Sequence, residues 1–447
     1  MFQNNKILIL GFARSGYEAA KYLLKRGNTV YLTDMKKDHD KKQMNELKEL
    51  GINFVLGEHP DDLLDKSFDY LIKNPGVPID HKYVLKAHEL GIEVINEVEM
   101  AFRLLPKNIK FVAITGTNGK TTTTTLIYKY LIEDKKRAHL TGNIGYPLIS
   151  FLDKLQENDV IVMETSCQQL ENLIKFNPDI AVMTNLSPAH VDFFKTYENY
   201  KRVKAKIFQN HTKDNIAILN IENDDVLEVT KNIKSTVKYF SSKKEINGSY
   251  IKNNAIYYYD EKIIDLSDIK LIGVHNYENI MASIMVVKEL GVKNESIKNV
   301  LTTFQGVEHR IEFVRELNGK KFYNDSKATN IKATQIALSS FKNAVVILLG
   351  GLDRGHDFFE LKDYMKYVKY IVAFGECRNR VEDFANKLNI PVKNVETLKE
   401  AVEIANKESV NGDTVLLSPA SASWDQYKCF EERGEEFKKL VMELDNK

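Results

Sequence analysis

Cysteine is scarce in this sequence and widely spaced. The 447 residues include three cysteines, Cys167, Cys377 and Cys429. They form neither a disulfide-pairing framework nor the closely spaced pairs of a zinc-binding motif. We therefore expect all three to be reduced bystanders.

An excess of charge of one sign is also missing. Lysine and arginine number 63, and aspartate and glutamate 62, which gives a formal net charge of +1. No global field draws such a protein to nucleic acid or to an anionic membrane, so any anionic ligand must be held by local groups. We expect small-molecule partners, no nucleic acid, no membrane, and a monomer.

Long apolar runs are absent too. The purely aliphatic stretches, such as Ala344–Leu349, are far too short to cross a bilayer. The sequence enters an expected strand at Lys6–Leu10 without the cationic segment, apolar core and cleavage site of a leader peptide. We expect a cytoplasmic protein, and its length suggests about three domains.

Alternating strand and helix patterns predict an α/β fold. The chain opens with a strand at Lys6–Leu10, a glycine-containing turn at Gly11–Gly16, a helix to about Lys25, and a strand from Thr29 to Asp34. This is the outline of a dinucleotide-binding half. Because Ala13 replaces the middle glycine of the G-x-G-x-x-G fingerprint, an ordinary strand-to-helix turn stays open as an alternative.

Two further α/β units follow, so we place the domains at 1–101, 102–306 and 307–447. A helix near Val98–Leu105 and the break at Pro106 mark the first boundary. We expect a surface β excursion at Lys231–Lys262 and a final charged helix from about Trp424. Buried strands are expected at Phe68–Ile72, Phe111–Ile114, Val160–Met163, Ile180–Thr184, Asn215–Leu219, Ala344–Leu349, Tyr370–Phe374 and Thr414–Leu417. Largely parallel sheets of this kind gather ligands at the carboxyl ends of their strands.

A glycine-rich turn at Ala113–Thr122 is typical of a phosphate-binding loop. Gly116 and Gly119 allow positive φ and a close approach of the backbone to an anion, and Lys120 adds a mobile cation. A hydroxyl next to that lysine, Thr121 or Thr122, can bind the Mg²⁺ that accompanies ATP. The strict P-loop pattern has glycine where this chain has isoleucine, so the match is to a shortened variant. A chance Gly-Lys-Thr in a structural turn is the alternative.

Polar side chains follow other expected strands of the same unit. Glu164 closes one strand, where a carboxylate can bind Mg²⁺ directly or through water. His190 lies in the loop after another strand, and a hydrogen-bonding structural histidine is the competing interpretation. Lys204 lies in a segment with charge every residue or two, a pattern typical of a solvated helix face. From the residues alone, we favour that interpretation of Lys204.

The third unit carries a dense polar stretch between a strand and a helix. Asp325, Lys327 and Thr329 suit a polyanion site, although capping of the following helix by Thr329 or Asn330 is a competing explanation.

Two other segments of the third unit suit carboxylate binding. Arg354 follows a fully apolar strand, so it is placed to meet a carboxylate as a fork. The hydroxyls and amides of Ser418–Ser423 can hold a second carboxylate, and a serine N-cap for a helix starting at Trp424 is equally open.

With these residues together, the chain resembles the Mur ligase family, the ATP-dependent amide-bond-forming enzymes of peptidoglycan precursor synthesis. The motifs occur in the family's order over nearly the whole length, at residues 116–121, 142–145, 185–190, 309–310 and 325–330. Segments 350–355 and 417–427 are similar to those of members that take D-glutamate as the incoming amino acid. The resemblance implies a Rossmann-like N-terminal domain for the UDP end of the substrate, a central P-loop ATPase domain with a mostly parallel sheet, and a Rossmann-like C-terminal domain for the amino acid.

The resemblance also implies site residues, one set for each ligand. The catalytic residues are Lys120, Glu164, His190 and Lys204. ATP contacts are Gly116, Thr117, Asn118, Gly119, Lys120, Thr121, Thr122, Arg310 and Asp325. The contacts to UDP-N-acetylmuramoyl-L-alanine are Ser15, Asp34, Asn74, Asn143, Ser166 and Gln169, and those to D-glutamate are Lys327, Thr329, Arg354, Ser423 and Phe430. Two Mg²⁺ ions are held by Thr121, Glu164, His190 and Lys204, the last if it is carbamylated.

Two departures from the family pattern affect the metal shell and the amino-acid site. Arg354 stands where some relatives carry lysine, and Ala189 stands where others carry an acid before the histidine. Rival interpretations are another amide ligase of the same architecture, such as the folate polyglutamylating type or a Mur ligase adding L-alanine, lysine or diaminopimelate, and a nucleotide switch or NAD-binding regulator without ligation chemistry.

Overall fold

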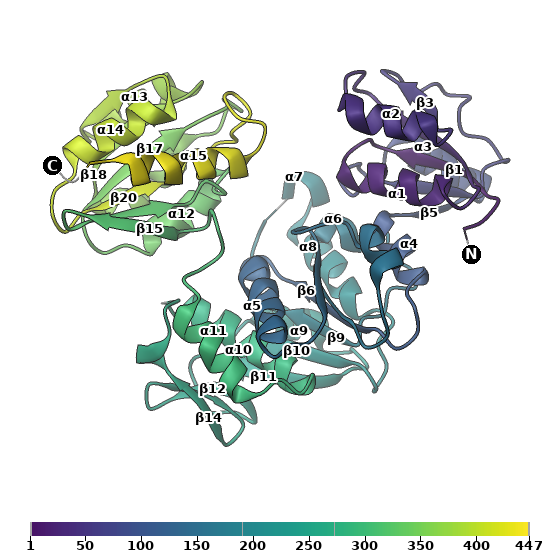
Figure 1. Ribbon diagram of the computed structural model, residues 1–447, viewed down its shortest axis with the longest axis horizontal. Coiled ribbons are helices and arrows are strands. Elements are labelled where there is room, and N and C mark those ends of the chain that lie inside the picture. Colours follow the sequence, from purple (N-terminus) through teal and green to yellow (C-terminus); the bar gives the residue numbers. More distant parts are fainter. Residues whose placement is uncertain (1, 190, 272, 446–447) are drawn as a thin grey trace. The chain divides into compact units, whose positions relative to one another are not determined.

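Three sheets follow one another along the chain, each covered by helices of its own stretch of sequence (Figure 1). The computed structural model describes residues 2–189, 191–271 and 273–445. The chain divides into two compact units, with the boundary between Thr303 and Phe304. The α/β architecture with three mostly parallel sheets is confirmed, whereas the domain boundaries after residues 101 and 306 stay predictions.

The first sheet is wholly parallel and has the order β3-β2-β1-β4-β5. Its strands are β1 (Lys6–Leu10), β2 (Thr29–Asp34), β3 (Asn53–Leu56), β4 (Tyr70–Lys73) and β5 (Glu93–Ile95), and its helices are α1 (Arg14–Leu24), α2 (Lys41–Glu49) and α3 (Lys82–Leu90). Residues 7–10 of β1 are buried, as is usual for a strand covered on both faces. Because the strand order reverses between β1 and β4, their carboxyl ends border the crevice in which such sheets bind ligands.

The turn after β1 needs both of its glycines. Gly11 has a φ of 106°, and a Cβ on Gly16 would lie 2.1 Å from the carbonyl oxygen of Gly11. Glycine therefore lets the first turn of α1 pack directly against the end of β1.

The second sheet has nine strands in the order β14-β13-β12-β11-β10-β9-β6-β8-β7. These are β6 (Lys110–Thr115), β7 (Ala138–Gly142), β8 (Val160–Glu164), β9 (Ile180–Met183), β10 (Ile216–Asn220), β11 (Thr236–Ser241), β12 (Gly248–Lys252), β13 (Ala255–Tyr258) and β14 (Glu261–Asp265). Its helices are α4 (Glu97–Arg103), α5 (Lys120–Glu133), α6 (Cys167–Leu170), α7 (Val191–Phe194), α8 (Tyr197–Ala205), α9 (Asp224–Thr230), α10 (Val274–Glu289) and α11 (Asn294–Thr303), with short 3₁₀ segments at Leu148–Lys154, Lys206–Phe208 and Leu266–Asp268. Helix α5 lies beside α10, whose residues 279–287 are all buried (Figure 1).

The stretch Lys231–Lys262, expected to be a surface β excursion, does contain β-strands, but they belong to the second sheet. Strand β11 pairs in parallel with β10, β12 pairs in parallel with β11, and two antiparallel strands complete the same sheet. Ile256 and Ile263 in this stretch are buried, and α10 contacts β11, β12 and β13. The many lysines of this stretch made it look exposed, although its apolar residues form a buried face of the second sheet.

The third sheet, in the second unit, has the order β15-β16-β20-β17-β18-β19. The strands are β15 (Glu312–Leu317), β16 (Lys320–Asn324), β17 (Val345–Gly350), β18 (Val368–Phe374), β19 (Val392–Asn394) and β20 (Thr414–Leu417). Strands β15 and β16 form an antiparallel hairpin, and the other pairings are parallel. The helices are α12 (Ile331–Ser339), α13 (Arg378–Lys387), α14 (Leu398–Glu408) and α15 (Phe430–Glu443), with a 3₁₀ segment at Phe358–Tyr367.

The final helix starts at Phe430, so the expected start near Trp424 is wrong. The carbonyl of Ser423 accepts hydrogen bonds from the amides of Gln426 and Tyr427, which closes a separate turn, and the N-cap of α15 is Cys429. The buried face of α15 begins only at Arg433, because the residues before it lack helical apolar spacing.

Candidate active site

The phosphate-binding loop joins β6 to α5 and has no room for side chains at its glycines. Gly116 and Gly119 have φ values of 147° and 81°. A Cβ on Gly116 would lie 2.0 Å from Thr184 Oγ1, and one on Gly119 would lie 2.1 Å from Asn279 Oδ1. Packing and backbone conformation therefore both require glycine here.

Two residues directly after β9, Thr184 and Asn185, hold this loop in place through hydrogen bonds. Thr184 Oγ1 donates to the carbonyl of Asn118 at 2.6 Å, and Asn185 Nδ2 donates to the same oxygen at 3.1 Å. In return, the amide of Asn118 donates to Asn185 Oδ1 at 2.9 Å, and the amide of Thr117 donates to the Asn185 carbonyl at 2.8 Å. The roles of Thr184 and Asn185 were missed from the sequence, although their place directly after a strand was a usable signal.

Two lysines converge on the loop. Lys120 Nζ donates to the carbonyls of Gly116 and Thr117 at 3.0 and 2.9 Å. Lys204 Nζ donates to the same Gly116 carbonyl at 2.8 Å and lies 5.0 Å from the ring centroid of Tyr200. Thr121 and Thr122, which follow Lys120 in the first turn of α5, are buried.

The interpretation of Lys204 as part of a solvated helix face is wrong. Its side chain is only 1% exposed, since α8 packs against the loop at this residue. Burial, together with the positive charge of Lys120, lowers the pKa of Lys204 to about 7. A large share of this amine is therefore neutral near physiological pH.

Glu164 is the last residue of β8 and is buried. Asn143 Nδ2 donates to Glu164 Oε1 at 2.8 Å, and the Asn143 amide donates to the Glu164 carbonyl at 2.9 Å. Glu164 Oε2 is also buried and accepts no hydrogen bond from any residue within the described ranges. A buried carboxylate oxygen without a donor is suited to a cation.

Ser166 and Gln169 form the N-terminal cap of α6. The Ser166 hydroxyl accepts from the Gln169 amide, and Gln169 Oε1 accepts from the Ser166 amide at 2.9 Å, which makes a capping box. Asn96 Nδ2 donates to the Gln169 carbonyl at 2.6 Å and so ties this helix to the start of α4.

A cavity of about 500 Å³ brings these clusters together. Its lining residues are Pro75, Gly76, Lys120, Asn143, Ser166, Cys167, Gln168, Phe193, Tyr200 and Lys204. The wall positions of Gln168, Phe193 and Tyr200 were not predicted. Cys167, expected to be a bystander, also lies in the wall, and burial raises the pKa of its thiol. All three cysteines are free, as expected.

The first sheet gathers Ser15, Asp34 and Asn74 at the carboxyl ends of its strands. Asn74 Nδ2 donates to Ser15 Oγ at 3.1 Å. Asp34 accepts from the amides of Phe12 at 2.7 Å and Lys36 at 2.8 Å. Pro75 and Gly76, which line the cavity, continue directly from Asn74. His190 lies outside the described residues.

Asp325 is buried in the second unit, just after β16. It accepts from the Ser418 hydroxyl at 2.7 Å and from the amide of Ile311 at 3.2 Å. Burial raises the pKa of Asp325 to about 7, against the lowering effects of these donors and of Arg310. The helix that follows is capped by Asn330, so Thr329 is not its cap.

The expected amino-acid residues lie on three loops, after β16, β17 and β20, and at the start of α15. Lys327 Nζ lies 5.4 Å from the ring centroid of Phe430, and the exposed Arg354 guanidinium lies 4.6 Å from that of Trp424. Ser423 is buried, and its hydroxyl finds no hydrogen-bond partner among the residues described. It is not the N-cap of the last helix.

Arg433 links the segments around these residues and was missed. It is fully buried and donates to Ser326 Oγ at 3.0 Å, to the Ser326 carbonyl at 2.9 Å and to the Ser421 carbonyl at 3.0 Å. Burial lowers its pKa to about 10. No local pattern distinguished this arginine from the solvated charges of the same helix.

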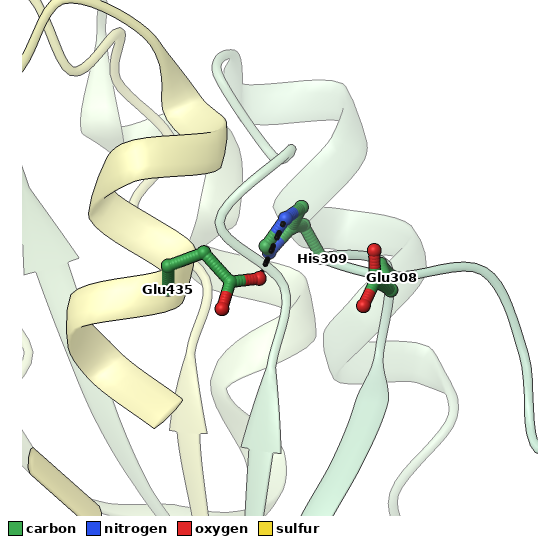
Figure 2. A group of neighbouring side chains, drawn as sticks. All are labelled: Glu308, His309 and Glu435. Carbon is green, nitrogen blue, oxygen red and sulfur yellow. Dashed lines mark ion pairs between the residues drawn. The ribbon is translucent and has the colours of Figure 1, made fainter. Parts of the chain in front are cut away.

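Glu308, His309 and Glu435 bring three groups that can bind metal close together. Figure 2 shows His309 and Glu435 facing each other, with Nε2 and Oε1 3.6 Å apart. Lys438 Nζ already contacts Glu435 at 2.7 Å and Glu308 at 3.2 Å. Because this ammonium supplies the positive charge, we do not assign a metal to the group.

A phosphate-binding loop with a buried carboxylate beside it is typical of an ATP-dependent enzyme. Three family models match successive parts of the chain, which therefore belongs to the Mur ligase family. Residues 5–96 match the Mur ligase MurD-like N-terminal domain, 114–287 the Mur ligase middle domain, and 309–421 the Mur ligase glutamate ligase domain. The resemblance inferred from the motifs is confirmed.

Two relatives that are similar over nearly their full length have the same name, and a solved structure of another ligase shares the fold. The chain is 46% identical over 437 residues to UDP-N-acetylmuramoylalanine–D-glutamate ligase of Lactococcus lactis subsp. lactis strain IL1403, which covers 98% of this chain and 97% of the relative. It is 44% identical over 438 residues to the enzyme of the same name from Bacillus subtilis strain 168, covering 97% of each. UDP-N-acetylmuramate–alanine ligase of Thermotoga maritima shares the fold, with a TM-score of 0.59, 19% identity, and coverage of 98% of this chain and 99% of that one.

No helix among residues 2–189, 191–271 and 273–445 is long and apolar enough to span a membrane.

Proposed function

We propose that this protein ligates D-glutamate to UDP-N-acetylmuramoyl-L-alanine, with ATP converted to ADP and phosphate, as a cytoplasmic step of peptidoglycan precursor synthesis. The observation that carries the proposal is the 46% identity, over nearly the full length of both chains, to a relative named for this reaction. The phosphate loop and the polar cavity beside it provide the chemistry that such a reaction needs.

ATP binds with its phosphates on the loop between β6 and α5. The loop amides and the N-terminus of α5 point at the negative charge, and Lys120 leaves the carbonyls of Gly116 and Thr117 to neutralise the phosphates. The proposed contacts of the first unit are Gly116, Thr117, Asn118, Gly119, Lys120, Thr121 and Thr122. Arg310 and Asp325 are the proposed contacts of the second unit.

Mg²⁺ fits the residues beside the loop, because Glu164 offers a buried carboxylate oxygen that receives no hydrogen bond from the described residues. Thr121, Glu164, His190 and a carbamylated Lys204 are the proposed ligands of two ions. When bound, the metal neutralises the charge that develops during phosphoryl transfer. Ala189 precedes the proposed ligand His190, and its methyl side chain offers no further ligand to the metal.

Carbamylation of Lys204 is favoured by its environment. With a pKa of about 7, roughly half of the amine is neutral at pH 7, compared with less than about one part in a thousand for an ordinary lysine. The neutral nitrogen attacks the carbon of CO₂ and releases one proton, which leaves a carbamate anion. A cation next to Lys120 thereby becomes an oxygen ligand for metal.

The substrate carboxylate must be activated before an amine can displace its oxygen. The γ-phosphoryl group is transferred to the carboxylate, which gives an acyl phosphate and ADP. The neutral amine of D-glutamate attacks the carbonyl carbon, phosphate leaves from the tetrahedral intermediate, and the proton that the nitrogen loses passes to the departing phosphate. Water must be excluded meanwhile, because the acyl phosphate hydrolyses readily.

Two clusters of the first unit hold the nucleotide substrate. Ser15, Asp34 and Asn74 hold the UDP end at the crevice of the first sheet. Asn143, Ser166 and Gln169 hold the muramoyl part. Pro75 and Gly76 line the same cavity as Asn143 and Ser166, which supports a single substrate that reaches from one cluster to the other.

D-glutamate binds in the second unit. Its carboxylates require cations and hydroxyl donors, and the proposed residues of these kinds are Lys327, Arg354, Thr329 and Ser423. Phe430 is the fifth proposed contact. The buried Ser423 hydroxyl, which has no partner among the described residues, supports this assignment.

An amino-acid panel tests the proposal. ADP release is measured with ATP, Mg²⁺ and UDP-N-acetylmuramoyl-L-alanine in the presence of D-glutamate, L-glutamate, L-alanine, lysine or diaminopimelate. We expect release to depend on D-glutamate and to disappear in Lys120→Ala. Release that depends on another amino acid assigns the chain to a different ligase, and nucleotide binding without any release supports a nucleotide switch instead.

A further inference from the structure

A fully buried lysine without a proposed role lies two residues before Pro75, which lines the cavity. Lys73 is the last residue of β4 and is 0% exposed. Its ammonium donates to the carbonyl of Val77 at 2.5 Å and lies 3.8 Å from Glu171 Oε2. The first contact closes the loop of residues 74–77 upon itself, and the second reaches a separate part of the chain.

Glu171 is the C-terminal cap of α6, whose residues Cys167 and Gln168 line the cavity. Its side chain is 8% exposed, and Oε2 accepts no hydrogen bond within the part of the chain that the structure describes. Its backbone is fixed because Lys206 Nζ donates to the Glu171 carbonyl at 2.6 Å. The positive charges of Lys73 and Lys206 both act on Glu171 and oppose the effect of its burial.

The two residues flank the two walls of the cavity. Pro75 and Gly76 directly follow Lys73 and its neighbour Asn74, whereas Ser166, Cys167 and Gln168 precede Glu171 on α6. One wall therefore follows a strand of the first sheet and the other belongs to the second domain's helix α6, and the Lys73–Glu171 pair links these two segments.

Stability alone is a poor reason for such a pair. Burying two charges costs desolvation energy that their attraction recovers only in part, and apolar residues of similar size are often as stable or more so. Other contacts already tie the same parts together, since Asn96 donates to the Gln169 carbonyl and Glu99 accepts from the amides of Ile174, Lys175 and Phe176. What the ion pair adds is a fixed position of the 74–77 loop relative to α6.

We propose that Lys73 is a positioning residue that, through Glu171, sets the separation of the two cavity walls and thereby the affinity for the UDP-sugar substrate. This inference rests on the proposed function, because it requires one substrate to lie along both walls. Lys73 itself does not take part in the reaction.

The titration of Lys73 gives the pair a pH signature. Burial lowers the pKa of Lys73 to about 8, against the raising effect of Glu171. The other titratable or charged groups around the pair are Lys206 and Asp80, which act on Glu171, and His81, whose pKa is lowered in part by Lys73. As the pH rises through about 8, Lys73 loses its proton, the ion pair is lost and the substrate affinity falls.

Stability changes in the opposite direction over that range. Between about pH 8 and the ordinary lysine value near 10.5, the unfolded chain binds the Lys73 proton more tightly than the folded chain. The Lys73 contribution to the unfolding free energy therefore rises with pH while the substrate affinity falls. A purely structural role does not produce these opposite trends.

The test measures dissociation constants by calorimetry for UDP-N-acetylmuramoyl-L-alanine and, separately, for ADP. Lys73→Met is compared with the double variant Lys73→Met/Glu171→Leu, in which no buried charge is left unpaired. Lys238→Met, which removes the ion pair with Glu289 away from the cavity, is the matched control. We expect both Lys73 variants to bind the sugar nucleotide about tenfold more weakly, since displaced binding groups lose affinity on that scale, with ADP affinity unchanged and the control like the parent.

The outcomes separate the inference from the proposed function. If the parent protein fails to bind the sugar nucleotide, the proposed function fails. If the parent binds it and the double variant, folded and binding ADP normally, binds it as tightly as the parent, the positioning role is refuted. An affinity of the parent that does not fall above pH 8, measured against the double variant, refutes it as well.

Discussion

Replacing Gly116 with alanine tests the phosphate loop most sharply, because two costs fall on one residue. The φ of 147° is strained for any residue with a side chain, at about 1–3 kcal/mol. The new Cβ would also lie 2.0 Å from Thr184 Oγ1, so the bond from that hydroxyl to the Asn118 carbonyl is lost, at about 1 kcal/mol.

The loop is the part that moves in this variant. Thr184 is buried directly after β9, so we expect the loop to shift away from the geometry that points its amides at phosphate. We expect the sum of about 2–4 kcal/mol to appear mainly in nucleotide binding, as a loss of about 30- to 700-fold in ADP affinity.

The assay is ADP binding by calorimetry together with thermal unfolding. Gly291→Ala is the matched control, since Gly291 also has a positive φ, of 73°, but a Cβ there meets nothing within 4 Å. We expect this control to lose about 1 kcal/mol of stability and no ADP affinity. ADP affinity of Gly116→Ala within twofold of the parent would show that the loop does not hold phosphate as described.

Three further changes probe the metal, the lysine and the buried acid. Glu164→Gln keeps the shape but removes the charge, so we expect it to weaken ADP binding about tenfold with Mg²⁺ present and hardly at all with the metal chelated; equal effects in both conditions contradict the metal role. Removal of CO₂ from the buffer should lower the rate of ADP release and bicarbonate should restore it, while Lys204→Ala should be indifferent to both; a parent enzyme insensitive to CO₂ contradicts carbamylation. Burial raises the pKa of Asp325 to about 7 from 3.8, so between these pH values the folded state binds a proton that the unfolded state has lost. The unfolding free energy should therefore fall as the pH rises from 4 to 7. Asp325→Asn should reduce this slope, and an unchanged slope counts against the raised pKa.

Local patterns in the sequence predicted much of the framework. The strands at Lys6–Leu10 and Thr414–Leu417 have the expected bounds, and the expected phosphate loop joins a strand to a helix. These features depend on apolar runs and on glycine, whose effects are confined to a few neighbouring residues.

Features that depend on distant contacts were not predicted. The charged segment around Lys204 gives no sign that one lysine is buried, because its burial comes from α8 packing against a loop nearly ninety positions earlier. Arg433 similarly bonds to Ser326, 107 positions away. The strands within Lys231–Lys262 joined the main sheet because their apolar residues pack against α10, which follows later in the chain.

The most direct measurement of the central claim is the mass of the product. The protein is incubated with ATP, Mg²⁺ and UDP-N-acetylmuramoyl-L-alanine, together with either D- or L-glutamate. We predict a new amide, with one ADP formed for each product molecule, only with D-glutamate. ATP binding without an amide product from either enantiomer, or a product from L-glutamate alone, contradicts the account.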